Sequence, residues 1–124
     1  MAQRILIIDD DERTRKLFRK ILEAESYEVI EASDGNEGIK LYRQDPTDLV
    51  ITDIIMPEKE GIETIMELKK DFPDVKVIAV SGGGHEEAES YLNIAKKVGA
   101  AEALTKPIKN DELVEIIANI LNKK

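Results

Sequence analysis

The sequence contains no cysteine and no tryptophan, and His85 is its single histidine. The absence of cysteine excludes disulfide frameworks and thiolate metal sites, and one histidine cannot build a histidine-cluster metal site. A metal ion bound by this chain therefore needs oxygen ligands, which favours magnesium, calcium or manganese. We expect His85 to be an exposed residue near the start of a helix rather than a metal ligand or a phosphate carrier.

Long apolar runs are also missing, and basic residues are in the minority. No apolar stretch approaches the 18 residues of a membrane span, so we expect no membrane insertion. Residues 1–4 lack the apolar core of a signal peptide, which predicts a cytoplasmic location. With 18 basic and 26 acidic side chains the net charge is −8, and aromatic residues make up 4%. This composition argues against direct nucleic-acid binding and leaves basic protein surfaces as partners.

The chain of 124 residues predicts one domain, residues 1–124, in which five strands alternate with five helices. The strands are expected at residues 4–9, 28–32, 49–52, 76–80 and 102–105. The helices are expected to begin near residue 11, to lie between residues 36 and 45, and to span residues 61–72, 86–98 and 111–121. Parallel strands require crossover connections, so this alternation predicts a parallel sheet with helices on both faces.

Apolar residues at helical spacing indicate which faces of the helices turn inward. The inward residues are expected to include Leu17, Phe18, Ile21 and Leu22 in the first helix, and Ile62, Ile65 and Met66 in the helix at 61–72. The strand at 28–32 is less apolar and is expected at an edge of the sheet. Asp11 is expected to cap the first helix, and Gly99 to end the helix at 86–98.

Polar side chains end four of the five predicted strands. Asp9 ends the first strand and Asp10 follows it; Asp53 follows the third, Ser81 the fourth and Lys106 the fifth. Taken singly, each predicts no more than a turn, a helix cap or a solvated strand end. The carboxyl ends of parallel strands meet at one edge of a sheet, so we expect the five side chains to converge there.

The chemistry of these side chains fits phosphoryl transfer. Three carboxylates close together repel one another, and a divalent cation relieves the repulsion. Magnesium is suited to this because it takes a few carboxylates and keeps waters that a phosphate can replace. Lys106 adds a positive charge and Ser81 a hydroxyl donor for the phosphoryl oxygens. Asp53 stands alone on a central strand, which makes it the best candidate nucleophile for an acyl phosphate.

Over essentially the whole chain, the sequence resembles a response-regulator receiver domain. The residues that carry the resemblance are Asp9-Asp10, the block Asp53-Ile54-Ile55-Met56-Pro57 with Gly61 after it, Ser81, and Lys106-Pro107. Each fragment alone is unspecific, but all four in this order and spacing are highly specific. The resemblance implies a fold of the α/β class, a flavodoxin-like doubly wound (βα)5 arrangement whose five-stranded parallel sheet has the strand order 2-1-3-4-5.

The same resemblance implies roles in phosphoryl transfer. Asp53 would accept a phosphoryl group from the phosphohistidine of a histidine kinase or a histidine phosphotransfer protein. Ser81 would donate a hydrogen bond to the phosphoryl group, and Lys106 would pair with it. The bond between Lys106 and Pro107 is expected to be cis. Such a domain catalyses its own phosphorylation and dephosphorylation, so we do not expect a classical turnover enzyme.

The resemblance also implies a magnesium cofactor. Asp10 and Asp53 would bind the ion directly, together with the backbone carbonyl of Ile55, and Asp9 would act largely through water. The same interpretation implies a downstream protein target. It further implies a monomer or a phosphorylation-dependent dimer, formed through the helix at 86–98 and the strand and helix that follow it.

The sequence departs from the family at Ala103, where many members carry an aromatic residue that reports phosphorylation. We therefore expect any conformational signal to rest on the Ser81 loop and the helix after it. Gly82, next to Ser81, is small, as access to the site requires. Ile55 and Gly83 occupy positions that tune phosphate lifetime, and neither can hold an attacking water with a polar group. Slow self-dephosphorylation is therefore expected.

Three alternatives compete with the receiver interpretation. A magnesium-dependent phosphatase also forms an aspartyl phosphate, but its second acid would occupy Ile55, and it needs a substrate-capping element that does not fit this length. A flavodoxin-like cofactor binder needs aromatic or hydroxyl-rich loops, whereas these loops are acidic. A degenerate receiver that only binds partners would not need the complete set of acids, hydroxyl and lysine.

Overall fold

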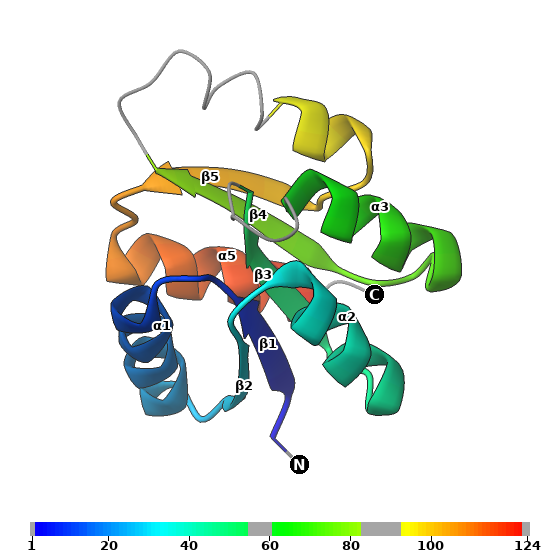
Figure 1. Cartoon of the computed structure of the whole chain (residues 1–124). Coiled ribbons are helices and arrows are strands. Elements are labelled where there is room, and N and C mark those ends of the chain that lie inside the picture. The colour runs from blue at the N-terminus through cyan, green and yellow to red at the C-terminus, as the bar shows by residue number, and fades with distance from the viewer. Residues whose placement is uncertain (1, 55–60, 83–92, 123–124) are drawn as a thin grey trace.

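The structure is a computed structural model that describes residues 2–54, 61–82 and 93–122. One sheet contains the parallel strands β1 (Arg4–Ile8), β2 (Glu28–Ala32), β3 (Leu49–Asp53), β4 (Val77–Gly82) and β5 (Glu102–Lys106). The strand order is β2-β1-β3-β4-β5 (Figure 1), which confirms the predicted doubly wound topology and the position of β2 at an edge.

Helices cover both faces of this sheet (Figure 1). They are α1 (Glu12–Ala24), α2 (Gly35–Gln44), α3 (Gly61–Asp71) and α5 (Asn110–Asn122), and residues 93–97 are also helical. α1 and α5 pack on one face, and α2, α3 and the 93–97 segment on the other. The helix predicted at 86–98 is confirmed over 93–97, and residues 86–92 lie outside the described residues. Across the described ranges, no helix is long and apolar enough to cross a membrane.

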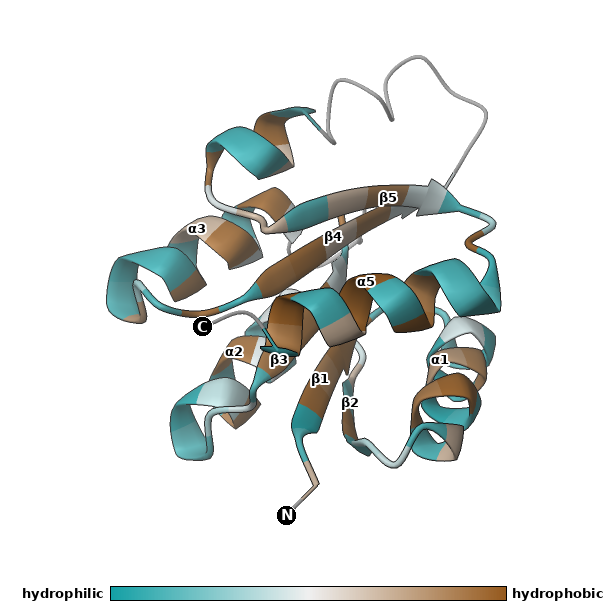
Figure 2. Ribbon diagram, turned by 180° about the vertical axis from the view of Figure 1, so that it is seen from behind, coloured by the Kyte–Doolittle hydropathy of each residue, from teal (hydrophilic) through white to brown (hydrophobic). Residues whose placement is uncertain are grey.

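The strands form continuous apolar runs because both faces of the sheet are covered. In β1, Leu6 and Ile8 join the core beneath α2 and α3, whereas Ile5 and Ile7 join the core beneath α1 and α5. All four side chains are at most 1% exposed. Figure 2 shows the hydrophobic strands enclosed by helices that carry alternating hydrophobic and hydrophilic bands. Two separate cores therefore hold the strands, and with them the polar residues at the strand ends.

Two residues predicted to be buried are exposed. Leu17 is 57% and Met66 is 53% exposed. Leu17 immediately precedes the buried Phe18 in α1, and Met66 immediately follows the buried Ile65 in α3. Successive residues of a helix are turned by about 100°, so a residue next to a buried one can lie outside the inward stripe, as Leu17 and Met66 do.

The predicted ends of several elements are shifted by one or two residues. β4 is longer than predicted, so Ser81 lies within the strand rather than after it, and Lys106 is the last residue of β5. Asp11 caps α1 as predicted, because its Oδ1 accepts a hydrogen bond from the backbone N–H of Arg13 at 3.0 Å. Gly99 has a φ of 120°, as expected for a glycine that ends a helix.

Ser26, just after α1, adopts a left-handed backbone conformation with a φ of 70°. Glycine adopts this conformation without the steric cost that a Cβ brings. We therefore expect Ser26→Gly to raise the free energy of unfolding by about 0.5–1 kcal/mol, measured by urea denaturation. Glu25→Gly is the control: its φ is −96°, so glycine there should lower stability. A Ser26→Gly variant that is less stable than the wild type would contradict the steric argument.

Candidate functional site

The carboxyl ends of four strands meet at one edge of the sheet, as predicted. Asp9 follows β1, Asp53 ends β3, Ser81 lies near the end of β4, and Lys106 ends β5. The register aligns Asp53 with Val80 on β4 and Gly82 with Lys106 on β5. Parallel pairing thus brings together side chains that are up to 97 residues apart in the chain.

The three predicted metal-binding carboxylates form one cluster. Asp9, Asp10 and Asp53 each offer an oxygen atom, and these atoms lie within 4.8 Å of one another. Asp9 is buried, Asp53 is half-buried and Asp10 is exposed. The cluster is therefore anchored in the sheet and open on one side. Oxygen donors of this kind and number are those that magnesium takes from proteins.

Lys106 reaches into this acidic cluster. Its Nζ lies 3.1 Å from Oδ2 of Asp9 and 3.5 Å from Oδ2 of Asp53. Burial disfavours the charged ammonium, but the attraction of Asp53 and Asp9 outweighs this and raises the pKa of Lys106. The lysine is therefore charged at neutral pH and bridges two of the three carboxylates. The peptide bond to Pro107 is cis, which confirms the prediction.

The N–H, the carbonyl and the carboxylate of Asp9 all form hydrogen bonds. Its backbone N–H donates to the carbonyl of Ala32 at 3.1 Å, and its Oδ1 accepts from the N–H of Asp11 at 2.9 Å. Its own carbonyl oxygen accepts from Nη1 of Arg15 at 2.6 Å. No sequence pattern singles out Arg15 as part of this site.

Ser81 is fully buried in β4, on the strand next to Asp53. Its hydroxyl lies 3.4 Å from the carbonyl oxygen of Gly82, which is at the limit of a hydrogen bond. Ala103 lies in β5, is half-buried and packs against the core beneath α3. Ile55, Gly83 and His85 lie outside the described residues, so the expectations that concern them stay predictions.

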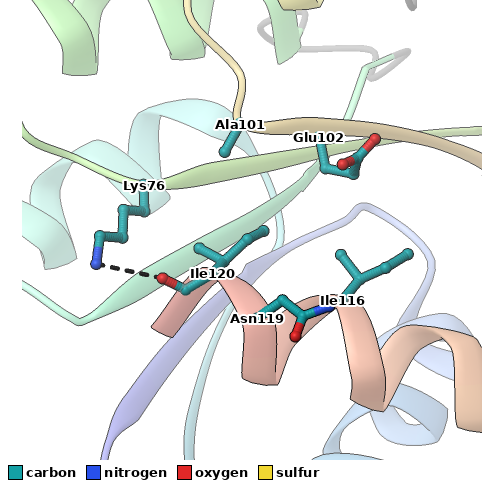
Figure 3. A pocket seen from close by; sticks show the side chains of 6 residues that line it. All are labelled: Lys76, Ala101, Glu102, Ile116, Asn119 and Ile120. Atoms are coloured by element: carbon teal, nitrogen blue, oxygen red, sulfur yellow. Dashed lines mark hydrogen bonds between the residues drawn. The ribbon is translucent and has the colours of Figure 1, made fainter. Parts of the chain in front are cut away.

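One groove shares no lining residue with this cluster, and Figure 3 shows the side chains that line it. It has a volume of about 360 Å³ and lies between the amino ends of β4 and β5 and the last turns of α5. Its lining residues are Lys76, Ala101, Glu102, Ile116, Asn119 and Ile120. Nζ of Lys76 donates across one side of the groove to the carbonyl of Ile120 at 3.4 Å. The groove opens at the opposite edge of the sheet from Asp53 and has no part in the acidic site.

The comparisons with known proteins agree with this geometry. The family model described as "Response regulator receiver domain" matches residues 5–118. The chemotaxis protein CheY of Halobacterium salinarum is 36% identical over 121 residues, covering 98% of each chain. The CheY of Bacillus subtilis is 35% identical, covering 98% of this chain and all of that protein. A receiver domain structure from Clostridium thermocellum aligns with a TM-score of 0.89 at 34% identity, over 98% of this chain and 95% of that one. The chain therefore belongs to the family of response-regulator receiver domains, the phosphoacceptor signalling modules of two-component systems.

Proposed function

We propose that Asp53 is the phosphoacceptor of this receiver domain and that residues 1–124 act as one signalling unit. The observation that carries this proposal is the acidic cluster at the strand ends, in which the ammonium of Lys106 bridges Asp9 and Asp53. Asp53 is the member that ends a central strand and lies 3.5 Å from Lys106. This arrangement offers a nucleophilic carboxylate next to a fixed positive charge, as phosphoryl transfer requires.

Magnesium fits the residues of this cluster. Three carboxylates and one ammonium sum to two negative charges, which a divalent cation balances. Asp10 and Asp53 would hold the ion directly, with the carbonyl of Ile55 as a further ligand. Both oxygens of Asp9 already accept hydrogen bonds, which suits a ligand that acts through water. Bound there, magnesium supplies positive charge for the phosphoryl oxygens.

The proposed transfer step assigns roles to Asp53, Ser81 and Lys106. An Oδ atom of Asp53 attacks the phosphorus of a phosphohistidine, so that a P–O bond forms as the P–N bond breaks. The electron pair of the broken bond leaves on the imidazole nitrogen. Lys106 then pairs with the new phosphoryl oxygens, and the hydroxyl of Ser81 donates to one of them. The product is an acyl phosphate, whose hydrolysis we expect to be slow.

The partners we propose are a histidine kinase or a histidine phosphotransfer protein upstream and a target protein downstream. Receiver domains interact with kinases and targets. The relatives include proteins named for chemotaxis and, over half of its length, the transcriptional regulatory protein CpxR of Escherichia coli. We propose a cytoplasmic signalling module without direct nucleic-acid contact, either monomeric or dimerising upon phosphorylation. A phosphatase and a binding-only module are not favoured by the complete site.

The proposed acceptor predicts a definite change in mass. Incubation with acetyl phosphate and magnesium is expected to add one phosphoryl group to the wild-type chain, measured by intact mass spectrometry. Without magnesium the adduct should be lost or strongly reduced, because the carboxylates would repel the incoming phosphate. Asp53→Asn should show no adduct.

Asp74→Asn is the matched control, because Asp74 is an exposed aspartate outside the acidic cluster. It should be phosphorylated like the wild type. An adduct that persists in Asp53→Asn would overturn the assignment of the acceptor. Steady consumption of acetyl phosphate without any adduct would support the phosphatase instead.

A further inference from the structure

Arg15 joins three parts of the molecule near the acidic cluster. It projects from α1, and its Nη1 donates to the carbonyl oxygen of Asp9 at 2.6 Å. Its Nε donates at 3.1 Å to Oε1 of Glu31 on β2. The side chain is 15% exposed, so most of the guanidinium is shielded from water. One rigid side chain therefore connects α1 and β2 to the turn that carries Asp9 and Asp10.

Glu31 holds this guanidinium in place. Its second oxygen accepts from Nε of Arg19 at 2.6 Å, so two arginines share one carboxylate. Burial raises the pKa of Glu31, but the hydrogen bonds from Arg19 and Arg15 outweigh it and lower the pKa. Glu31 is therefore a carboxylate at neutral pH. Arg19 also reaches Glu23 at 3.1 Å, and it makes no described contact with the acidic cluster.

The carbonyl that Arg15 binds belongs to the peptide unit that joins Asp9 to Asp10. The N–H of Asp9 is fixed by the carbonyl of Ala32, and the N–H of Asp11 by the Asp9 carboxylate. Within the described residues, the carboxylate of Asp10 has no hydrogen bond or ion pair of its own. The direction of the Asp10 side chain therefore depends on the backbone. Arg15 fixes that backbone through the carbonyl of the Asp9–Asp10 peptide.

We propose that Arg15 is a positioning residue for the divalent cation: its hydrogen bonds to Asp9 and Glu31 set the Asp9–Asp10 peptide so that the Asp10 carboxylate lies beside those of Asp9 and Asp53, where it would hold the ion. The proposal rests on the proposed function, since it concerns the same acidic cluster. Groups behind metal ligands orient them and raise affinity in this way. Arg15 would not touch the ion or the phosphoryl group.

Arg15→Lys separates the effect of hydrogen-bond geometry from the effect of charge. An ammonium keeps the positive charge but cannot donate two hydrogen bonds in the fixed geometry of a guanidinium. Arg15→Lys should therefore weaken the hydrogen bond to the carbonyl of Asp9, while the positive charge near the cluster is kept. Arg19→Lys is the matched control. It also replaces an arginine that donates to Glu31, but it leaves the hydrogen bond from Arg15 to the carbonyl of Asp9 in place.

The experiment is calorimetric titration of the full chain with magnesium chloride. Arg15→Lys is expected to bind magnesium about tenfold more weakly than the wild type. Arg19→Lys should stay within about twofold, with a comparable change in melting temperature. Phosphorylation of Arg15→Lys by acetyl phosphate should require more magnesium but approach the wild-type rate at saturation. If Arg15 contributed only to stability, Arg15→Lys and Arg19→Lys would show similar magnesium affinities and similar melting temperatures. The magnesium concentration that Arg15→Lys needs for phosphorylation would then equal that of the wild type.

Equal magnesium affinities of Arg15→Lys and the wild type would overturn the inference and leave the proposed function intact. Equal weakening in Arg15→Lys and Arg19→Lys would overturn it too. A wild-type chain that does not bind magnesium would overturn the proposed function itself. If Arg15→Lys does not fold, Glu31→Gln replaces it, because an amide keeps the shape of the side chain but weakens its hold on Arg15. An unchanged magnesium affinity in Glu31→Gln would then count against the inference.

Discussion

Gly61→Ala is expected to lower the free energy of unfolding by about 3 kcal/mol. A Cβ at this position would lie 2.1 Å from the carbonyl oxygen of Asp53 and 2.6 Å from Cα of Ile54. Both atoms belong to the backbone, so no side chain can turn away to make room. The N–H of Gly61 also donates to the carbonyl of Ile54 at 2.7 Å, which holds the two segments together.

Gly82→Ala is the matched control for this substitution, because a Cβ there meets no heavy atom within 4 Å. Its stability should stay within about 0.5 kcal/mol of the wild type. Urea denaturation of both variants measures the difference. Because the clash at Gly61 displaces the peptide of Asp53, phosphorylation of Gly61→Ala should also fall by more than the unfolded fraction explains. A Gly61→Ala variant as stable as Gly82→Ala would show that the close approach to Asp53 is relieved at little cost.

Lys106→Met is expected to change two properties of the site in opposite directions. The substitution removes the positive charge that lies 3.1 Å from Asp9 and 3.5 Å from Asp53. Magnesium should then bind roughly tenfold more tightly or better, since unit charges 4 Å apart interact by about 4 kcal/mol at an effective dielectric constant of about 20. Phosphorylation by acetyl phosphate should nevertheless slow by roughly 100-fold, because a donor to the developing phosphoryl charge is lost.

The measurements are calorimetric titration with magnesium and the time course of the phosphorylated mass. Lys109→Met is the control, because it removes the same charge from an exposed position three residues further along. It should leave both quantities within about twofold of the wild type, as expected for a screened surface charge. The expected tighter binding assumes that Lys106 and magnesium compete for Asp9 and Asp53. Weaker magnesium binding by Lys106→Met than by the wild type would contradict this competition.

The topology of the fold could be predicted because the strands carry a strong signal. In β1 and β3, apolar residues follow one another without alternation, which is typical of strands buried on both faces. Once the strands are parallel, the convergence of Asp9, Asp53 and Lys106 follows from the direction of the chain alone. The structure brings these three side chains together, as expected.

The helix surfaces and the contacts behind the site were less predictable. Apolar spacing cannot set the width of a buried stripe, so it places Leu17 and Met66 in the core although both are exposed. Arg15 gives no signal of its own, because an arginine on an amphipathic helix is ordinarily solvated. Its two acceptors lie 6 and 16 residues away in sequence, on different elements, so only the folded chain brings them within reach.

In the proposed signalling step, the net charge of the acidic cluster limits what a partner protein can detect. Asp9, Asp10, Asp53 and Lys106 together carry two negative charges, and a bound divalent cation brings the sum to zero. Replacing the carboxylate of Asp53 by an acyl phosphate then adds about one negative charge. The occupied site stays within one charge of neutrality, in a chain whose net charge is already −8. We therefore expect a partner protein to recognise the rearranged hydrogen-bond donors around the phosphate, and to respond only weakly to the change in electrostatic potential.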